Sequence, residues 1–551
     1  MNLAKLHEAI SEHFHDRECL VYGDRRFSWG QFTDRTRRLA TLFRKHGLGV
    51  YRERSALENW ESGQDHIALL LHNCNEYMEG LMGAYKCRAV PFNVNYRYQH
   101  EELLYLLQNA QTRAVVYHAR FAPLLKSIKK QLPEIKLWLQ VDDGSGQPLL
   151  LGALDYERAL LASRADPMDE KASGNDLFMI YTGGTTGMPK GVLWRQQDIF
   201  HALIASYLPD GITQDEVVEK AASRMARAKT GMALPPFMHA SGCCVAMGVW
   251  FMGNTLLIQS STERFVAEEV VQEMESERVA SIAIVGDAFA EPLLSVLDKG
   301  EHDLSALRLI SSGGAILSER NKQRFQQHLP QVIIYDVLGS SETGQQGMNI
   351  SRDQQVASSV DFHMSDGGTI IDASMRKVLT AGSDEIGWMA QRGHVALGYL
   401  NDPAKTAKTF PVLDGVRYSV PGDRAQINAD GTVHLLGRES VTINSGGEKV
   451  FSEEVESVIK RLEGVRDAQV IGTPCERFGQ QVTALIARHD GSVLSVDEIQ
   501  KHCRAHLADY KMPRRVILLE NIERTLTGKP DYEWAGATAL KWQQNEFKEV
   551  M

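Results

Sequence analysis

Glycine, threonine and lysine gather in one short stretch of the chain, in a combination that suits the binding of phosphate groups. Four glycines, three threonines and Lys190 lie between the apolar runs 177–181 and 192–194. Glycine lets the backbone approach a ligand closely, and a turn whose N–H groups point inward binds anions. Threonine hydroxyls and a lysine add further donors. We therefore interpret this stretch as a phosphate-binding loop.

Two other interpretations of the loop are weaker. A Gly/Thr turn that binds no ligand would not need Lys190 and paired threonines. A Walker-type loop would place Ser or Thr directly after the lysine, at the start of a helix. Here Gly191 follows Lys190, so that signature is absent.

The apolar runs beside the loop are of strand length, and similar units come before them. Strands are predicted at 67–71, 89–93 and 114–117, with helices at 77–87 and 101–108. An amphipathic helix is predicted over 27–47, preceded by Ser28. Residues 51–66 are polar and predict a surface loop. Because strands and helices alternate, we expect an α/β fold with parallel pairing and helical crossovers.

Size and composition limit the class of protein. A chain of 551 residues predicts a large domain plus a smaller one. A net charge of -10 argues against nucleic acid as the main partner. The 7 cysteines are odd in number and form no Cys-x-x-Cys pair, which favours a reducing cytoplasm. The apolar run 243–258 is too short to span a membrane and is predicted to be a buried core segment. Residues 1–10 lack the long apolar core of a signal peptide.

The run 181–191 resembles the phosphate loop of the adenylate-forming superfamily, which includes acyl-CoA synthetases, luciferases and peptide-synthetase adenylation domains. Further segments that resemble its motifs follow in family order at 234–242, 309–315, 335–344, 418–423, 436–456 and 524–530, so the resemblance covers about 500 residues. It implies a large N-terminal domain of mixed sheets with packed helices, and a small mobile α+β C-terminal domain. We place these domains at 1–436 and 437–551.

The resemblance also implies which residues bind ATP. They are Thr182, Gly183, Gly184, Thr185, Thr186, Lys190, Gly313, Gly314, Ala315, Asp336, Ser341, Asp423 and Arg438. A carboxylate such as Asp423 can accept two hydrogen bonds from a ribose diol. Asp336 is expected to accept a hydrogen bond from the exocyclic amine of adenine. Leu338 stands where the family usually has an aromatic residue that stacks on adenine, and Pro421 replaces a threonine.

Magnesium and acyl sites are implied in the same way. Glu342, in a Gly/Ser loop, suits Mg²⁺ because that ion prefers oxygen ligands, and Thr186 is expected to assist it. Taken alone, His239 would more often be structural. The segment 234–242 resembles a family motif in which the histidine lies beside the substrate carboxylate, and Met238 shifts His239 by one position from that motif. The resemblance therefore implies that His239 lies beside the substrate carboxylate. The expected acyl site comprises His239, Gly242, Gly286, Phe289, Gly313 and Gly339. A blocking Trp250 or Phe289 would favour acetate instead of a longer acid.

The C-terminal motifs are expected to act after a domain movement. The hinge is predicted near 438–440, where Ser440 replaces the usual Asp or Lys. Ser452 is predicted to cap an acidic helix start. The resemblance implies that Gly446 and Gly447 line the CoA channel and that Lys529 enters the cleft on a turn.

The resulting hypothesis is an ATP-dependent acyl-CoA synthetase. A carboxylate would attack the α-phosphate of ATP, and the acyl-adenylate would then react with CoA. Lys529, Glu342, Thr186 and His239 are the expected catalytic residues, with ATP, Mg²⁺ and CoA as substrates and cofactor. Medium- or long-chain fatty acids or bulky acids resembling steroid side chains are favoured. A non-catalytic nucleotide or acyl binder, an enzyme with an acceptor other than CoA, and a homodimer all stay open.

Overall fold

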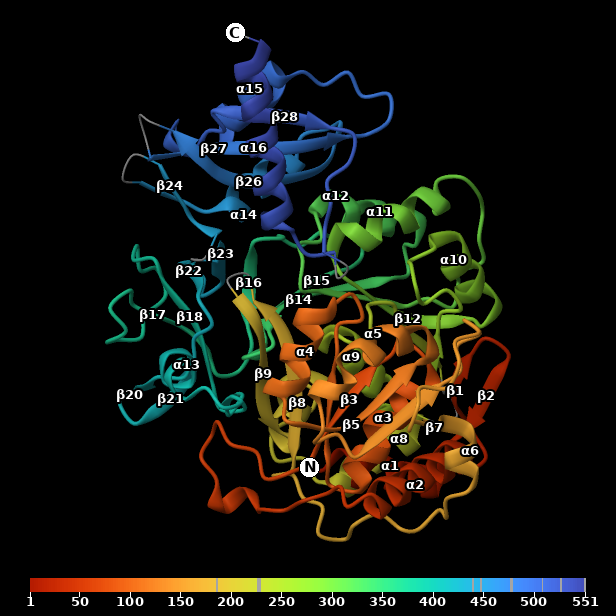
Figure 1. Cartoon of the computed structure of the whole chain (residues 1–551). Helices are drawn as coiled ribbons and strands as arrows, with labels where there is room; N and C mark the ends of the chain where they lie inside the picture. Colours follow the sequence, from red (N-terminus) through yellow and green to blue (C-terminus); the bar gives the residue numbers. More distant parts are fainter. Residues whose placement is uncertain are drawn as a thin grey trace.

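The computed structural model describes residues 1–184, 187–224, 229–438, 441–445, 448–475, 479–507, 509–525 and 528–549. Figure 1 shows a large body that ends with strand β23 (Val433–Arg438) and a smaller C-terminal part above it. Strand β24 (Ile443–Ser445) already belongs to the smaller part. A mixed α/β architecture with a large N-terminal and a small C-terminal unit was predicted, and it is confirmed. The division at residue 437 stays a proposal.

One sheet of the body is parallel, as the alternating pattern predicts. Its order is β4 (Val90–Asn93), β3 (His66–Leu70), β5 (Thr112–His118), β6 (Leu137–Val141) and β7 (Leu154–Asp155). Its connections contain α3 (Asn75–Lys86), α4 (His100–Asn109), α5 (Ala122–Ile128) and α6 (Tyr156–Leu161). The predicted strands and helices in this region end within two residues of the observed ones.

A second sheet runs through the rest of the body and contains 15 strands in the described residues. Its order is β2 (Arg25–Ser28), β1 (Glu18–Tyr22), β11 (Thr255–Ile258), β10 (Thr230–Ala233), β12 (Val279–Ile284), β13 (Leu309–Gly313), β14 (Ile333–Ser340), β15 (Gly344–Ser351), β16 (Asp361–Met364), β23, β22 (Asp423–Ile427), β18 (Gly387–Arg392), β21 (Val416–Ser419) and β20 (Val412–Leu413), with β17 (Gly368–Ile371) beside β18. From β1 through β14 the pairing is parallel, and beyond β14 it is antiparallel.

The predicted phosphate loop lies at the tip of a hairpin. Strands β8 (Leu177–Gly184) and β9 (Gly187–Arg195) are antiparallel, and β19 (Gly398–Tyr399) pairs with β9 on its other side. A strand follows the loop where a Walker-type loop would require a helix, which agrees with the rejection of that signature.

Helices pack on the sheets of the body. They are α1 (Leu3–Phe14), α2 (Trp29–Lys45), α7 (Gln196–Ile199), α8 (Gln214–Arg224), α9 (Ala240–Phe251), α10 (Ala267–Ser276), α11 (Gly286–Leu297), α12 (Glu319–His328) and α13 (Pro403–Thr409). Ser28 is the N-cap of α2 and forms a reciprocal capping box with Gln31, which fixes where the helix begins. The run 243–258 forms most of α9 and all of β11, and its large side chains are buried, as predicted.

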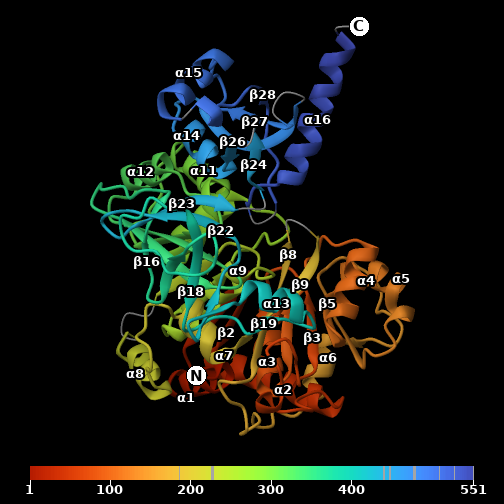
Figure 2. The ribbon, with the colours of Figure 1, turned by 90° about the vertical axis from the view of Figure 1, so that its left-hand side faces the viewer.

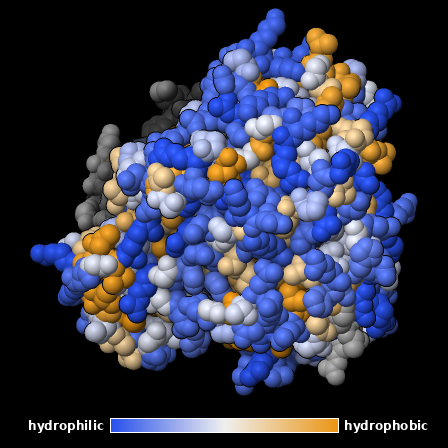
Figure 3. Space-filling view, turned by 90° about the horizontal axis from the view of Figure 1, so that it is seen from below, coloured by the Kyte–Doolittle hydropathy of each residue, from blue (hydrophilic) through white to orange (hydrophobic). Residues whose placement is uncertain are grey.

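The surface seen from below is mostly hydrophilic, with hydrophobic residues in small groups (Figure 3). No helix of the described ranges combines the length and the apolar character that crossing a bilayer would require.

The C-terminal part has its own sheet and core. The sheet order is β25 (Glu448–Val450), β24, β27 (Gly479–Arg488) and β26 (Val465–Cys475), with β28 (Arg515–Leu519) beside β27. Helices α14 (Ser452–Lys460), α15 (Val496–His506) and α16 (Tyr532–Glu549) complete it. The capping prediction for Ser452 was wrong, because the N-cap is Phe451. The hydroxyl of Ser452 instead donates to the carbonyl of Val441 at 2.9 Å.

The C-terminal part sits on α11 and α12 of the body in both views (Figures 1 and 2). Arg320 on α12 donates to the carbonyl of Val465 at 3.2 Å. Gly528 is close to the body, since a Cβ there would lie 3.1 Å from the carbonyl oxygen of Val285. Gly437 has a φ of +116°, and a Cβ there would lie 2.0 Å from a carboxylate oxygen of Glu453. Glycine at 437 therefore permits both the turn and the close approach of α14.

Candidate active site

The end of β8 is tied to the segment that carries His239 by one asparagine. Asn93, at the end of β4, donates to the carbonyls of Tyr181 at 2.8 Å and Met238 at 2.6 Å. The side-chain oxygen of Asn93 accepts from the backbone N–H of Tyr181 at 2.7 Å. A single amide side chain therefore fixes the phosphate-loop strand relative to His239. Sequence reasoning missed Asn93 because its partners are distant in the sequence.

Lys190 has an acidic partner from a distant segment. Its ammonium lies 2.6 Å from the Asp402 carboxylate, at the start of α13. Burial would raise the pKa of Asp402, but the hydrogen bonds from Lys190 and from the backbone N–H of Lys405 hold it below its usual range. The ion pair holds the side chain of Lys190 against Asp402, beside the loop that is predicted to bind phosphates.

Lys190 would have to exchange Asp402 for a phosphate when ATP binds. Replacing Asp402 by asparagine is therefore expected to lower the KM for ATP by up to about fivefold, because a partly exposed ion pair contributes about 1 kcal/mol or less. Asparagine can still cap α13, since the Asp402 side chain accepts from the N–H of Lys405. Steady-state kinetics would measure the change, with exposed Asp384→Asn as the matched control. A KM for ATP that rises tenfold would instead show that Lys190 needs Asp402 to be positioned.

Three hydrogen bonds from other segments hold the loop after β14, which carries Glu342. The hydroxyl of Tyr399 donates to Oε1 of Glu342 at 2.8 Å, and Ser419 donates to the Glu342 carbonyl at 2.9 Å. The indole of Trp194 donates to the carbonyl of the neighbouring Ser341 at 2.9 Å. Since Trp194 is on β9 and Tyr399 on β19, the three-stranded hairpin sheet directly positions the predicted metal ligand.

Lys529 reaches into the body from the C-terminal part. Its Cε lies 3.5 Å from the position that a Cβ on Gly314 would occupy, just after β13. Burial, with a smaller contribution from the Lys529 ammonium, lowers the pKa of His239 to about 3. His239 is thus neutral at physiological pH. Its Nε2 is buried and has no hydrogen-bond partner within the described part of the chain. It is available to a bound carboxylate or acyl oxygen.

A narrow apolar cavity of about 10 Å³, room for about one water molecule, lies beside His239. Its walls come from α3, β4, β8 and the start of α9, through Tyr77, Leu81, Tyr85, Pro91, Phe92, Asn93, Phe178, Met179, Ile180, Ala240 and Cys243. Of the residues predicted for the acyl site, His239 is one of the cavity's lining residues and the others are not. Neither Trp250 nor Phe289 blocks this space, since Trp250 donates to the Cys19 carbonyl and Phe289 packs against Phe265.

The expected acyl-site glycines serve backbone packing. A Cβ on Gly242 would lie 2.4 Å from the Pro236 carbonyl oxygen, and one on Gly286 2.4 Å from that of Ile316. On Gly339 it would lie 2.1 Å from the carbonyl oxygen of Gly344. Their missing side chains would fall on backbone atoms, so the backbone itself requires glycine at these three positions. Their place in the acyl site stays a prediction.

Two of the nucleotide predictions have different outcomes. Asp423 and Arg438 are directly paired neighbours on β22 and β23, so the backbone brings these two predicted ribose contacts together. Asp336 is buried and pairs with the equally buried Lys322 at 2.7 Å. Its carboxylate is therefore committed inside the protein, and we withdraw the expected contact with adenine.

Five predicted site residues lie outside the described residues, namely Thr185, Thr186, Ser440, Gly446 and Gly447. Their roles stay predictions.

Comparison with known proteins identifies the class. The AMP-binding enzyme model matches residues 7–400, and the AMP-binding enzyme C-terminal domain model matches 454–529. The chain therefore belongs to the AMP-binding enzyme family, as the phosphate-loop motif predicted. Within that family it falls in the branch of the acyl-CoA ligases.

Individual relatives match over nearly the whole chain. A medium-chain acyl-CoA ligase, Mig, of Mycobacterium avium is 43% identical over 539 residues, covering 97% of both chains. A 3-oxocholest-4-en-26-oate–CoA ligase of Rhodococcus rhodochrous is 35% identical over 97% of this chain and 95% of its own. The fold is similar to that of the anthranilate CoA ligase AuaEII, with a TM-score of 0.81 at 21% identity over 98% of each chain.

Proposed function

We propose that this protein converts a medium-chain carboxylic acid, ATP and CoA into acyl-CoA, AMP and pyrophosphate through an acyl-adenylate. The observation that carries the proposal is the position of Lys529. The proposal is supported by the Cε of Lys529, which packs against Gly314, and by the charge of Lys529, which contributes to the lowered pKa of His239 beside the apolar cavity. A cation there can stabilise the negative charge that develops when a carboxylate attacks a phosphate.

In the first half-reaction the protein mainly positions and stabilises charge. The phosphate loop and Lys190 hold the β- and γ-phosphates, while Asp423 and Arg438 hold the ribose. Neutral His239 orients the acid, and Lys529 stabilises the developing charge at the α-phosphate. Mg²⁺, when bound by Glu342 and Thr186, supplies further neutralisation of phosphate charge.

The second half-reaction needs a different arrangement. With Lys529 beside Gly314, Gly528 packs against Ala288 and Val285 of the body. We therefore propose that the C-terminal part turns at the hinge near 438–440, which withdraws Lys529 and brings Gly446 and Gly447 to the site for CoA. The six buried thiols among the seven cysteines, all of them unpaired, agree with a cytoplasmic location.

The apolar lining of the cavity and the named relatives favour a linear acid of medium length. At about 10 Å³ the cavity is far below the usual range for ligand pockets, about 300–1,000 Å³, so wall side chains must move to admit an acyl chain. A steroid ring system would need a larger movement of the wall than a slim methylene chain. A narrow apolar wall suits a flexible methylene chain, and the 43% identical relative is named for medium-chain acids.

Pyrophosphate release with ATP, Mg²⁺ and CoA across linear acids of increasing length is expected to show one optimum at medium length. Each added methylene should raise kcat/KM by about fourfold until the cavity is filled, because burying a CH₂ is worth about 0.8 kcal/mol. The product should co-elute with synthetic acyl-CoA. A steroidal acid that exceeds every linear acid would contradict the assigned chain length.

Ala240→Leu provides the matching test of the cavity, since Ala240 is one of its lining residues. The optimum should shift to shorter acids while the KM for ATP stays unchanged. An unchanged length profile would show that the acyl chain binds elsewhere. Absence of pyrophosphate release with every acid would support the non-catalytic binder, and adenylate formed without any acyl-CoA would support a different acceptor.

A further inference from the structure

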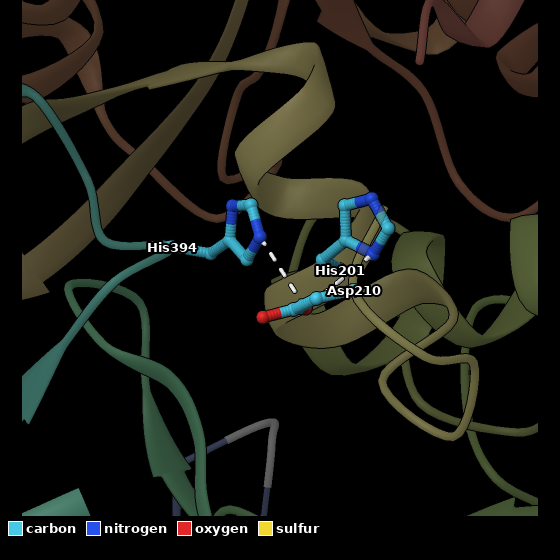
Figure 4. Close-up of side chains that lie close together, drawn as sticks. All are labelled: His201, Asp210 and His394. Carbon is cyan, nitrogen blue, oxygen red and sulfur yellow. Dashed lines mark ion pairs between the residues drawn. The ribbon is translucent and has the colours of Figure 1, made fainter. Parts of the chain in front are cut away.

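Two histidines and an aspartate converge on one point outside the proposed active site (Figure 4). His201 comes from the π-helix η4 (Phe200–Ile204), Asp210 from the turn that follows it, and His394 from the connection between β18 and β19. Nδ1 of His201 lies 3.9 Å from the Asp210 carboxylate, and Nε2 of His394 lies 3.4 Å from it. One ligand atom from each residue lies within 4.8 Å of the other two.

His201 points a buried nitrogen into this cluster. Its side chain is only 9% exposed. Its Nδ1 is fully shielded from solvent and has no hydrogen-bond partner within the described residues. Buried polar atoms in folded proteins are nearly always satisfied. The wide π-helical turn directs the ring at Asp210, and such turns are frequent at functional sites. An unsatisfied nitrogen in this position indicates a ligand.

His394 is oriented by a second carboxylate. Its Nδ1 contacts buried Asp198 at 2.9 Å, and Asp198 also accepts from Arg195 at 2.5 Å. An Asp198 carboxylate beside Nδ1 favours the tautomer whose hydrogen is on that atom, which leaves the lone pair of Nε2 facing Asp210. A histidine whose second nitrogen is bound to a carboxylate is the usual arrangement around protein-bound metals.

The carboxylates around the cluster fit a cation. Asp198 and Asp210 both lie beside His394, at 2.9 and 3.4 Å from its two ring nitrogens. The two imidazole rings stack with centroids 4.7 Å apart, an arrangement that disfavours two protonated rings. Arg195 is paired with Asp198, and the N-terminal amine also faces His201. Neutral imidazoles and an aspartate are the ligands that zinc prefers.

We propose that His201, Asp210 and His394 bind one divalent transition-metal ion of the Zn²⁺ type, with water as the remaining ligand. In a tetrahedral zinc site the ligand atoms are about 3.3–3.5 Å apart. Asp210, whose side chain is 78% exposed, can close its own 3.9 and 3.4 Å separations, and a small rotation of one imidazole would bring the two ring nitrogens, which lie within 4.8 Å, to the same spacing. Two nitrogen ligands disfavour Mg²⁺ and Ca²⁺, which prefer oxygen.

The ion would join two segments that support the Glu342 loop. Helix η4 packs against β15, where Ser206 donates to Gln345 at 2.8 Å and a Cβ on Gly344 would lie 2.6 Å from the Ala202 carbonyl oxygen. His394 comes shortly before β19, which carries Tyr399, the hydrogen-bond donor to Glu342. Metal binding should therefore stabilise the fold around this loop without contacting the substrates.

The test uses the full-length protein after treatment with a chelator. Equilibrium dialysis with ZnCl₂ should show one ion bound per chain at micromolar free zinc, and Co²⁺ should give the visible absorption of a tetrahedral site. Zinc, but not Mg²⁺, should raise the melting temperature. Asp210→Asn and His201→Gln should each weaken zinc binding at least about tenfold and remove the thermal shift, since each deletes one ligand.

His506→Gln is the matched control, because His502 and His506 on the C-terminal part are also neighbours, with tilted rings whose centroids are 4.4 Å apart. It should bind zinc like the unaltered protein. If His201→Gln does not fold, the exposed Asp210→Asn still tests the site. Zinc binding that is absent from the unaltered protein, equal in Asp210→Asn, or lost in His506→Gln would overturn the proposal.

Discussion

Replacing Lys529 by alanine should lower the rate of acyl-adenylate formation by about 10²–10³-fold, the usual loss when a charge-stabilising donor is removed. Lys529 reaches Gly314 from the C-terminal part and faces neutral His239, so it is the cation that this conformation delivers to the body. Release of pyrophosphate in a single turnover would measure this step.

The same variant should keep most of its thioester-forming activity when a synthetic acyl-adenylate and CoA are supplied. That reaction is proposed to follow the withdrawal of Lys529. Lys501→Ala, an exposed lysine on α15 of the same part, should leave both half-reactions unchanged. Equal losses in the two half-reactions of Lys529→Ala would contradict the division of labour proposed for the C-terminal part.

Glu342→Gln should also slow adenylation by about 10²–10³-fold and raise the Mg²⁺ concentration needed for half-maximal rate. Glutamine keeps the size of the side chain and an oxygen that can accept from Tyr399, so the substitution removes mainly the negative charge. A titration of the initial rate with Mg²⁺ would measure both effects.

Tyr399→Phe separates the charge of Glu342 from its orientation. This variant keeps the carboxylate but loses the 2.8 Å hydrogen bond to Oε1. We expect a loss of about tenfold to a hundredfold, because one hydrogen bond to a charged group is worth about 1.5–3 kcal/mol. A Glu342→Gln enzyme with unchanged rate and unchanged Mg²⁺ dependence would remove Glu342 from the metal site.

The sequence predicts the local features of this molecule well. The strand–loop–strand form around Lys190 follows from apolar runs and glycines, and the helix predicted over 27–47 is observed at Trp29–Lys45 with Ser28 as its N-cap. Periodicity and capping act within a few residues, so they are visible without tertiary information. The family motifs likewise predicted the class of the protein, because each is a short run of adjacent residues.

Contacts between distant segments could not be predicted in this way. Asn93 lies 88 positions from Tyr181, and Lys190 lies 212 positions from Asp402. Asp336 resembles a family position, yet a buried lysine on α12 determines its partner. Nor could it be predicted that Gly242, Gly286 and Gly339 are required by the backbone of other residues, which passes through the volume that their side chains would fill.

The cavity beside His239 shares one strand with the predicted nucleotide contacts. Its walls come from α3, β4, β8 and α9, and β8 also leads into the phosphate loop. Substitutions on α3 and α9 can therefore change the choice of acid without altering a residue that is expected to bind ATP, whereas substitutions on β8 would affect both. Relatives named for medium-chain, 3-oxocholestenoic and hydroxybutyric acids fit a fold whose acid-facing helices vary while the phosphate-loop strand is kept.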